Sequence, residues 1–145
     1  MDWKEKSKEQ LVQFKKDVGY KEELIVSEAY EPYIEKQGKL EPNLKQYPNS
    51  DLPGVYIFYS ESTGFLYIGK CSNNLGFRIG AHIGKPGDKA APEYPYPYAE
   101  SWIIENKNDL KVITIPLKRE HFFLAPALET YMIWKLKPPY NARSK

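Results

Sequence analysis

The sequence contains a single cysteine, Cys71, and this scarcity excludes an internal disulfide. A chain without disulfides suits the reducing cytosol. The sequence also lacks a run of about 18 apolar residues, the length needed to span a membrane. Residues 1–10 are rich in charge and do not contain the apolar segment of a secretory signal. We therefore expect a cytoplasmic protein that does not insert into a membrane.

The chain carries little net charge, +2 at pH 7, which is too small by itself to indicate a nucleic-acid binder. The charges are unevenly distributed. Residues 1–50 hold nine Lys and ten acidic residues, whereas residues 51–145 hold twelve basic and nine acidic residues. Residues 135–145 are basic and contain no acid. This basic tail is either a solvated end or a contact for phosphate groups.

Hydrophobic and aromatic residues, in contrast, are plentiful. They make up 41% and 14% of the 145 residues, which favours one folded domain with a modest core over a disordered chain.

The first part of the chain is predicted to be helical. Residues 4–17 have the spacing of an amphipathic helix that stops at Gly19. The residues on its apolar face are Leu11, Phe14 and Val18. Residues 21–36 favour a second helix, which begins or kinks at Pro32. Residues 38–53 are rich in Pro, Asn and Ser and indicate a connector.

Two β-rich segments, residues 54–59 and 65–69, follow this connector. The turn-forming residues 60–64 separate them, so the pair is predicted to be a β-hairpin. In the simplest register Tyr56 lies directly opposite Tyr67, close enough for both to reach one ligand. A bulge would change this register.

A short helix is predicted next, over residues 73–83, with Asn73 or Asn74 as its N-cap. Arg78 and His82 are neighbours on this helix because they are four residues apart.

The remaining segments alternate between loop and regular structure. Residues 84–97 contain four prolines and two glycines and are predicted to form a loop. Residues 102–104 indicate a strand or a helical turn, and residues 112–115 a further strand. Residues 124–136 are predicted to form a helix that ends before Pro138 and Pro139.

A carboxylate lies on the apolar face of this last helix. At about 100° per residue, Glu129 falls in the middle of a stripe formed by Ala125, Met132, Ile133 and Leu136. A buried carboxylate without a partner costs several kcal/mol or stays protonated. Glu129 therefore holds a divalent cation, or it forms a structural bond to a buried Arg or Tyr.

The hairpin also carries a two-part motif. Gly54-Val55-Tyr56 and Tyr67-Ile68-Gly69 resemble the two triplets that name the GIY-YIG nucleases, with Val in place of the first Ile. The similarity continues in the order of that family over residues 53–141. The further matching residues are Lys70, Arg78, His82, Glu129 and, in the segment Lys137-Pro138-Pro139-Tyr140-Asn141, the final asparagine.

The resemblance implies an α+β fold with a small antiparallel sheet of three strands, or of four if residues 102–104 are a strand, flanked by helices. We expect such a domain over residues 51–145, preceded by a helical extension over residues 1–50. Some family members have Tyr where this chain has His82, whereas certain restriction enzymes resemble it in having His. The minimal family module has no clear counterpart for the loop 84–97 or for the extension, which leaves the biological role open.

The resemblance also implies roles for the charged residues. Glu129 would bind one Mg²⁺ or Mn²⁺, with water and substrate phosphate completing the coordination shell. Arg78 would contact the scissile phosphate and stabilise its developing charge. Asn141 would brace the site, for example by bonding the backbone near the metal ligand.

The tyrosines would handle the attacking water. Tyr56 would act as general base or would orient that water, and Tyr67 would position water or phosphate beside it. Because a phenol has a pKa of about 10, we expect Lys70 to lower the pKa of Tyr56. His82 would relay a proton, bond the phosphate or be structural. Cys71 is interpreted as a packed neighbour.

Three functions follow from these observations. The first is a metal-dependent endonuclease that cleaves duplex or branched DNA. The second is a nucleic-acid- or protein-binding module that keeps the fold without turnover. The third is an accessory domain in which residues 1–50 dock a second copy of the chain or a partner protein.

Overall fold

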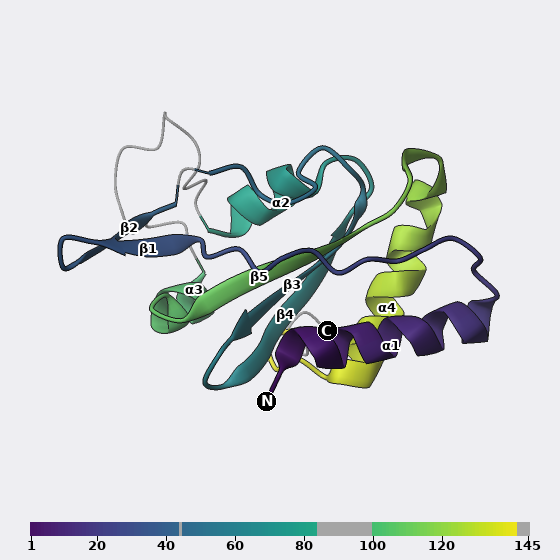
Figure 1. Cartoon of the computed structure of the whole chain (residues 1–145), viewed down its shortest axis with the longest axis horizontal. Helices are drawn as coiled ribbons and strands as arrows, with labels where there is room; N and C mark the ends of the chain where they lie inside the picture. The colour runs from purple at the N-terminus through teal and green to yellow at the C-terminus, as the bar shows by residue number, and fades with distance from the viewer. Residues whose placement is uncertain (44, 84–99, 142–145) are drawn as a thin grey trace.

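The structure is a computed structural model, and it describes residues 1–43, 45–83 and 100–141 (Figure 1). The predicted loop 84–97 and the last four residues of the basic tail lie outside the described residues. The elements are α1 (Trp3–Val18), β1 (Tyr33–Lys36), β2 (Lys39–Pro42), β3 (Gly54–Ser60), β4 (Gly64–Cys71), α2 (Leu75–His82), α3 (Ser101–Asn106), β5 (Leu110–Pro116), η1 (Arg119–Leu124) and α4 (Ala125–Leu136).

A three-stranded antiparallel sheet in the order β4-β3-β5 forms the centre of the fold, as predicted. Helix α2 lies on one side of the sheet, and α1 with α4 lies on the other (Figure 1). Residues 102–104 belong to helix α3, so the alternative of a fourth strand there is wrong. The sheet therefore has an apolar cluster on each face, and β3, between its two neighbours, is buried along its whole length.

The register of the predicted hairpin differs from the simplest one. Tyr56 pairs with Gly69 and Phe58 pairs with Tyr67, so the prediction that Tyr56 lies directly opposite Tyr67 was wrong. The cause is an irregularity between Phe58 and Tyr59, which leaves Leu66 as an extra residue in β4. Tyr56 and Tyr67 still lie on one face, as diagonal neighbours with ring centroids 6.4 Å apart.

Helix α1 matches its prediction except at its end. Leu11 and Phe14 are each only 2% exposed and pack into the cluster beneath α4. Val18 is 52% exposed, so its assignment to the apolar face was wrong. The helix ends at this point because Gly19 adopts the left-handed conformation, with φ of 72°, and its N–H bonds to the Lys15 carbonyl.

The second helix predicted over residues 21–36 is not formed. Instead the chain runs along the outer edge of β5: Ser27 N–H donates to the Thr114 carbonyl, and Tyr30 exchanges two backbone hydrogen bonds of 2.9 Å with Val112. A two-stranded hairpin, β1–β2, follows around Gln37 and Gly38, which both have positive φ, as a two-residue hairpin turn requires. Strand β2 occupies the beginning of the predicted connector.

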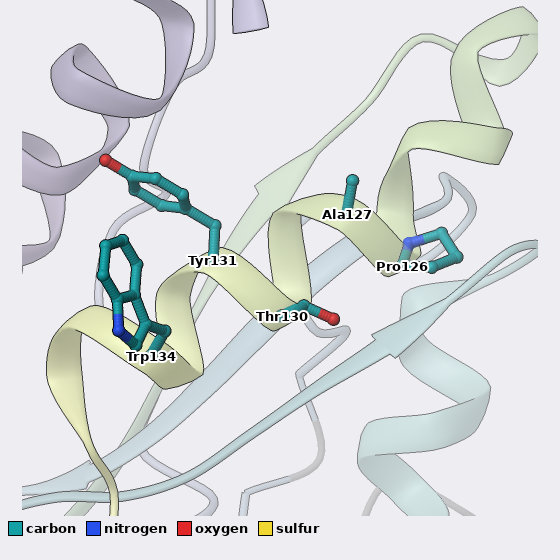
Figure 2. A pocket seen from close by; sticks show the side chains of 5 residues that line it. All are labelled: Pro126, Ala127, Thr130, Tyr131 and Trp134. Atoms are coloured by element: carbon teal, nitrogen blue, oxygen red, sulfur yellow. The ribbon is translucent and has the colours of Figure 1, made fainter. Parts of the chain in front are cut away.

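Helix α4 presents different faces to the sheet and to solvent. Ala125, Leu128 and Met132 are fully buried. On its outer side, the residues lining a shallow apolar hollow are Pro126, Ala127, Thr130, Tyr131 and Trp134 (Figure 2). None of these five side chains belongs to the polar hollow around Glu129. Within the described residues, no helix is long and apolar enough to cross a membrane.

Candidate active site

A polar hollow of ≈ 320 Å³ lies beside β4, an edge strand of the sheet. Helix α2 follows β4 directly in the chain and α4 packs against it, so both helices contribute side chains. The residues that line the hollow are Tyr67, Gly69, Lys70, Cys71, Ser72, Arg78 and Glu129. The hollow therefore brings together four residues predicted for the site, from three different elements.

Glu129 contributes a carboxylate that has no hydrogen-bond or ion-pair partner among the residues that the structure describes. The side chain is half-buried, and burial raises the pKa of its carboxyl group, while the positive charges of Lys70 and then Arg78 oppose this shift. Among the described residues, no hydrogen bond or ion pair joins Glu129 to another side chain. The structural bond to Arg or Tyr, one of the two predicted interpretations, is thus not formed within the described part of the chain.

Tyr56 pairs with Gly69, which lines the hollow, and is completely buried. Its ring crosses over Gly69, its partner in β4. A Cβ atom at position 69 would lie 2.2 Å from the Tyr56 hydroxyl oxygen, so only glycine leaves room for this ring. The hydroxyl is hydrogen-bonded to His82 Nε2 at 2.7 Å.

The protein groups around Tyr56 do not lower its pKa, so that prediction was wrong. Burial raises the pKa of Tyr56 well above its ordinary value, and Tyr67 adds to the increase, whereas the charge and hydrogen bonding of Arg78 oppose it. Lys70 has no part in this shift because side chains alternate along a strand. Lys70 lies on the face of the sheet that α4 covers, and Tyr56 on the face that α2 covers.

His82 connects Tyr56 to a second carboxylate. Its Nδ1 atom contacts Glu100 Oε1, and the other oxygen of Glu100 accepts a bond of 3.1 Å from Trp102 Nε1. Burial lowers the pKa of His82, although the nearby Glu100 partly offsets the decrease. The net shift favours the neutral form of the ring.

Tyr67 forms the wall of the hollow next to His82. Its ring is half-buried and stacks on Trp102 at 5.5 Å, and Trp102 stacks in turn on Tyr140 at 5.7 Å. Burial is the main cause that raises the pKa of Tyr67, followed by the charges of Glu100 and Glu129. The stack holds the ring close to the rings of Tyr56 and His82, with centroid distances of 6.4 Å and 4.9 Å.

Asn141 stabilises β4 from outside the sheet. Its Oδ1 atom accepts from Ile68 N–H and its Nδ2 atom donates to the Ile68 carbonyl, both at 2.8 Å. The side chain is 6% exposed and occupies the position that a neighbouring strand would take. It thus braces the backbone of β4 between Tyr67 and Gly69. Cys71 is half-buried at the rim, and His121 bonds Tyr20 at 2.8 Å, outside the hollow.

The geometry agrees with a comparison of the sequence with known families. A model of the GIY-YIG catalytic domain matches residues 52–141, which is more than half of the chain. The chain belongs to the GIY-YIG family. The matched model is that of a catalytic domain.

The relatives of this GIY-YIG chain include two proteins named UvrABC system protein C. The one from Fervidobacterium nodosum is 34% identical over 102 residues, which cover 70% of this chain and 15% of the relative. The one from Pseudothermotoga lettingae is 31% identical over 94 residues, which cover 65% and 15%. The chain thus spans only a small part of these relatives. No solved structure matches the chain.

In this GIY-YIG domain, sequence reasoning missed Glu100 and the role of Trp102. Glu100 is half exposed, and 18 residues separate it from His82. No periodic pattern connects the two positions. A weak signal was available, because a Trp in a polar segment needs a partner for its indole N–H.

Proposed function

We propose that the domain is an endonuclease that hydrolyses phosphodiester bonds of DNA with a single Mg²⁺ or Mn²⁺ ion held by Glu129. The observation that carries this proposal is the half-buried carboxylate of Glu129, which has no hydrogen-bond or ion-pair partner among the described residues and lines a hollow with Lys70 and Arg78. A carboxylate between two cations in an open polar hollow suits a site where a metal ion and a phosphate meet.

The donor set fits one hard cation. Carboxylate oxygen is the ligand that Mg²⁺ prefers, and Mg²⁺ keeps several waters where protein ligands are few. Across the described ranges 1–43, 45–83 and 100–141, no three His, Cys, Asp or Glu side chains are grouped to enclose a metal. When bound, the ion would polarise the phosphate and lower the pKa of a coordinated water.

Arg78 and Lys70 would hold the phosphate. Arg78 is exposed on α2 and Lys70 half-buried on β4, and both line the hollow with Glu129. The planar guanidinium can bond two phosphate oxygens at once, and its charge is needed most when negative charge builds up in the transition state. Lys70 would act on the phosphate as a point charge. It would not act through the pKa of Tyr56, because Lys70 is not among the groups that shift that pKa.

Tyr56 and His82 would move the proton of the attacking water. Since its pKa is raised, the Tyr56 phenol stays protonated and cannot act as a preformed phenolate. Neutral His82 accepts the phenol proton at Nε2 while the phenol oxygen takes a proton from water, whose oxygen forms the new bond to phosphorus. The leaving oxygen departs with the electrons of the broken P–O bond and takes a proton from solvent.

The alternative is a binding module without turnover. A binding module gives no reason for a carboxylate of raised pKa beside two cations, whereas an endonuclease needs that carboxylate to hold the metal ion. Three expectations stay predictions. They are the docking of a partner or a second copy through residues 1–50, the cytoplasmic location and the domain division at residue 50.

The experiment is cleavage of supercoiled plasmid by the purified chain with Mg²⁺, with Mn²⁺ or with EDTA. We expect nicking with either metal and none with EDTA. Glu129→Gln is the test variant, and Glu105→Gln, a charge change on the exposed side of α3, is its matched control. Plasmid that is bound but stays intact under every metal condition would favour the binding module.

A further inference from the structure

Glu100 is a carboxylate to which the catalytic scheme above gives no task. It immediately precedes α3, and both of its oxygens are engaged, one by His82 Nδ1 and one by Trp102 Nε1. Trp102 is only 3% exposed and is stacked on Tyr67 and on Tyr140, so it offers a fixed donor. The carboxylate is therefore held at one end by a rigid ring, and its other oxygen is directed at the histidine.

The pairing determines which nitrogen of His82 carries the hydrogen. An ionised carboxylate only accepts hydrogen bonds, so the Nδ1 atom facing Glu100 must be the protonated one. In the neutral ring the Nε2 atom is then bare, and its partner at 2.7 Å is the Tyr56 hydroxyl, which can donate. With the opposite tautomer, an Nε2–H group would face Tyr56 and His82 could accept no proton from it.

We propose that Glu100 is a positioning residue, which fixes His82 in its Nδ1–H tautomer and aims the bare Nε2 atom at the Tyr56 hydroxyl. This inference rests on the proposed function. In the proton transfer described above, the Tyr56 O–H bond breaks, an Nε2–H bond forms and the ring becomes an imidazolium cation. Glu100 then faces that cation across a charge-assisted hydrogen bond, the arrangement by which a carboxylate orients and stabilises a catalytic histidine.

The other groups around His82 do not duplicate this role. Tyr67 of β4 contacts the face of the imidazole ring, with centroids 4.9 Å apart, and Arg78 of α2 is a cation that opposes a positive charge on it. Phe58 of β3 packs edge-on against the ring at 5.7 Å and holds its plane. Among the described residues, only Glu100 accepts from Nδ1.

Glu100→Ala tests the proposal, with Glu105→Ala on the exposed side of the same helix as its matched control. The tautomer of His82 is measured by long-range ¹H–¹⁵N correlation spectra, which distinguish Nδ1–H from Nε2–H. The two histidines of the chain are assigned by comparison with His82→Gln. We expect the Nδ1–H tautomer in the wild type and the control, and a shift toward Nε2–H in Glu100→Ala. Plasmid cleavage at saturating DNA should fall on the order of 10- to 100-fold in Glu100→Ala only.

A second variant separates the effect of orientation from the effect of charge. It also keeps the test possible if Glu100→Ala does not fold. Glu100→Gln keeps an amide oxygen that can accept from Nδ1–H, so the tautomer should persist while cleavage recovers only in part. An Nε2–H tautomer in the wild type, or an unchanged cleavage rate in Glu100→Ala, overturns the proposal. The wild type could show the Nδ1–H tautomer, and Glu100→Ala could lose it, while neither protein cuts DNA. The positioning contact would then stand, and the proposed nuclease function would be wrong.

Discussion

The replacement Gly69→Ala should damage both the fold and the proposed chemistry, because it adds one methyl group where the Tyr56 ring passes. An ideal Cβ at this position lies 2.2 Å from the hydroxyl oxygen of Tyr56 and 2.3 Å from its Cζ atom, whereas ordinary contacts begin at 3.4 Å. The ring would have to move by about 1 Å, yet it is completely buried. Overpacking of this kind typically costs about 1–3 kcal/mol.

Urea unfolding of four proteins measures this effect: the wild type, Gly69→Ala, Tyr56→Leu and the double variant. Leucine at position 56 removes the ring atoms that would clash. In that background we expect the cost of Gly69→Ala to vanish, or to reverse by about 0.5–1 kcal/mol because alanine restricts the unfolded chain. In the wild-type background we expect the full loss, with plasmid cleavage reduced roughly 100-fold by the displaced hydroxyl. Equal costs in both backgrounds, within about 0.5 kcal/mol, would refute the reasoning.

Four further predictions concern the hollow. Glu129→Gln should abolish metal-dependent cleavage with an unchanged or higher free energy of unfolding, because the amide is isosteric but binds Mg²⁺ poorly; full cutting by this variant contradicts the metal site. Arg78→Ala should lower turnover more than DNA affinity in gel-shift assays, and the reverse order would make Arg78 a docking residue. Tyr56→Phe should reduce cleavage about 10²–10⁴-fold and Tyr67→Phe less, whereas the opposite ranking exchanges their roles. Cleavage should fall as pH decreases through a midpoint below 6.5, because burial lowers the pKa of His82 and a protonated ring cannot accept a proton. The same titration lowers the free energy of unfolding as pH falls. A midpoint of cleavage above 6.5 contradicts the relay.

The sequence predicted those elements whose pattern is local. The β3–β4 hairpin, strand β5 and helix α4 each have a clear period and clear end signals, and all are formed. The hairpin register was not predictable, because the Leu66 carbonyl, at the irregular position of β4, accepts from the Tyr140 N–H, which is far away in the sequence. The helix predicted over residues 21–36 was wrong for a similar reason, because pairing with the edge of β5 outweighs a weak helical preference.

The site shows the same division. Glu129 was predictable because a charge in an apolar stripe is an anomaly that a helical projection reveals. The placement of Lys70 could have been read from the strand period, because Lys70 is three residues after Tyr67 and therefore lies on the opposite face of the sheet from Tyr67 and Tyr56. Glu100 was invisible because an exposed glutamate is ordinary until its distant partner is known.

The coverage of both sheet edges has a consequence for how copies of this chain meet. Residues 27–30 pair with the outer edge of β5, and Asn141 takes up both backbone groups of Ile68 on the outer edge of β4. An incoming strand would have to displace one of these segments before it could extend the sheet, so the apolar strands are shielded from edge-to-edge aggregation. Contacts between copies that leave these segments in place would have to use other surfaces of the domain than the two sheet edges.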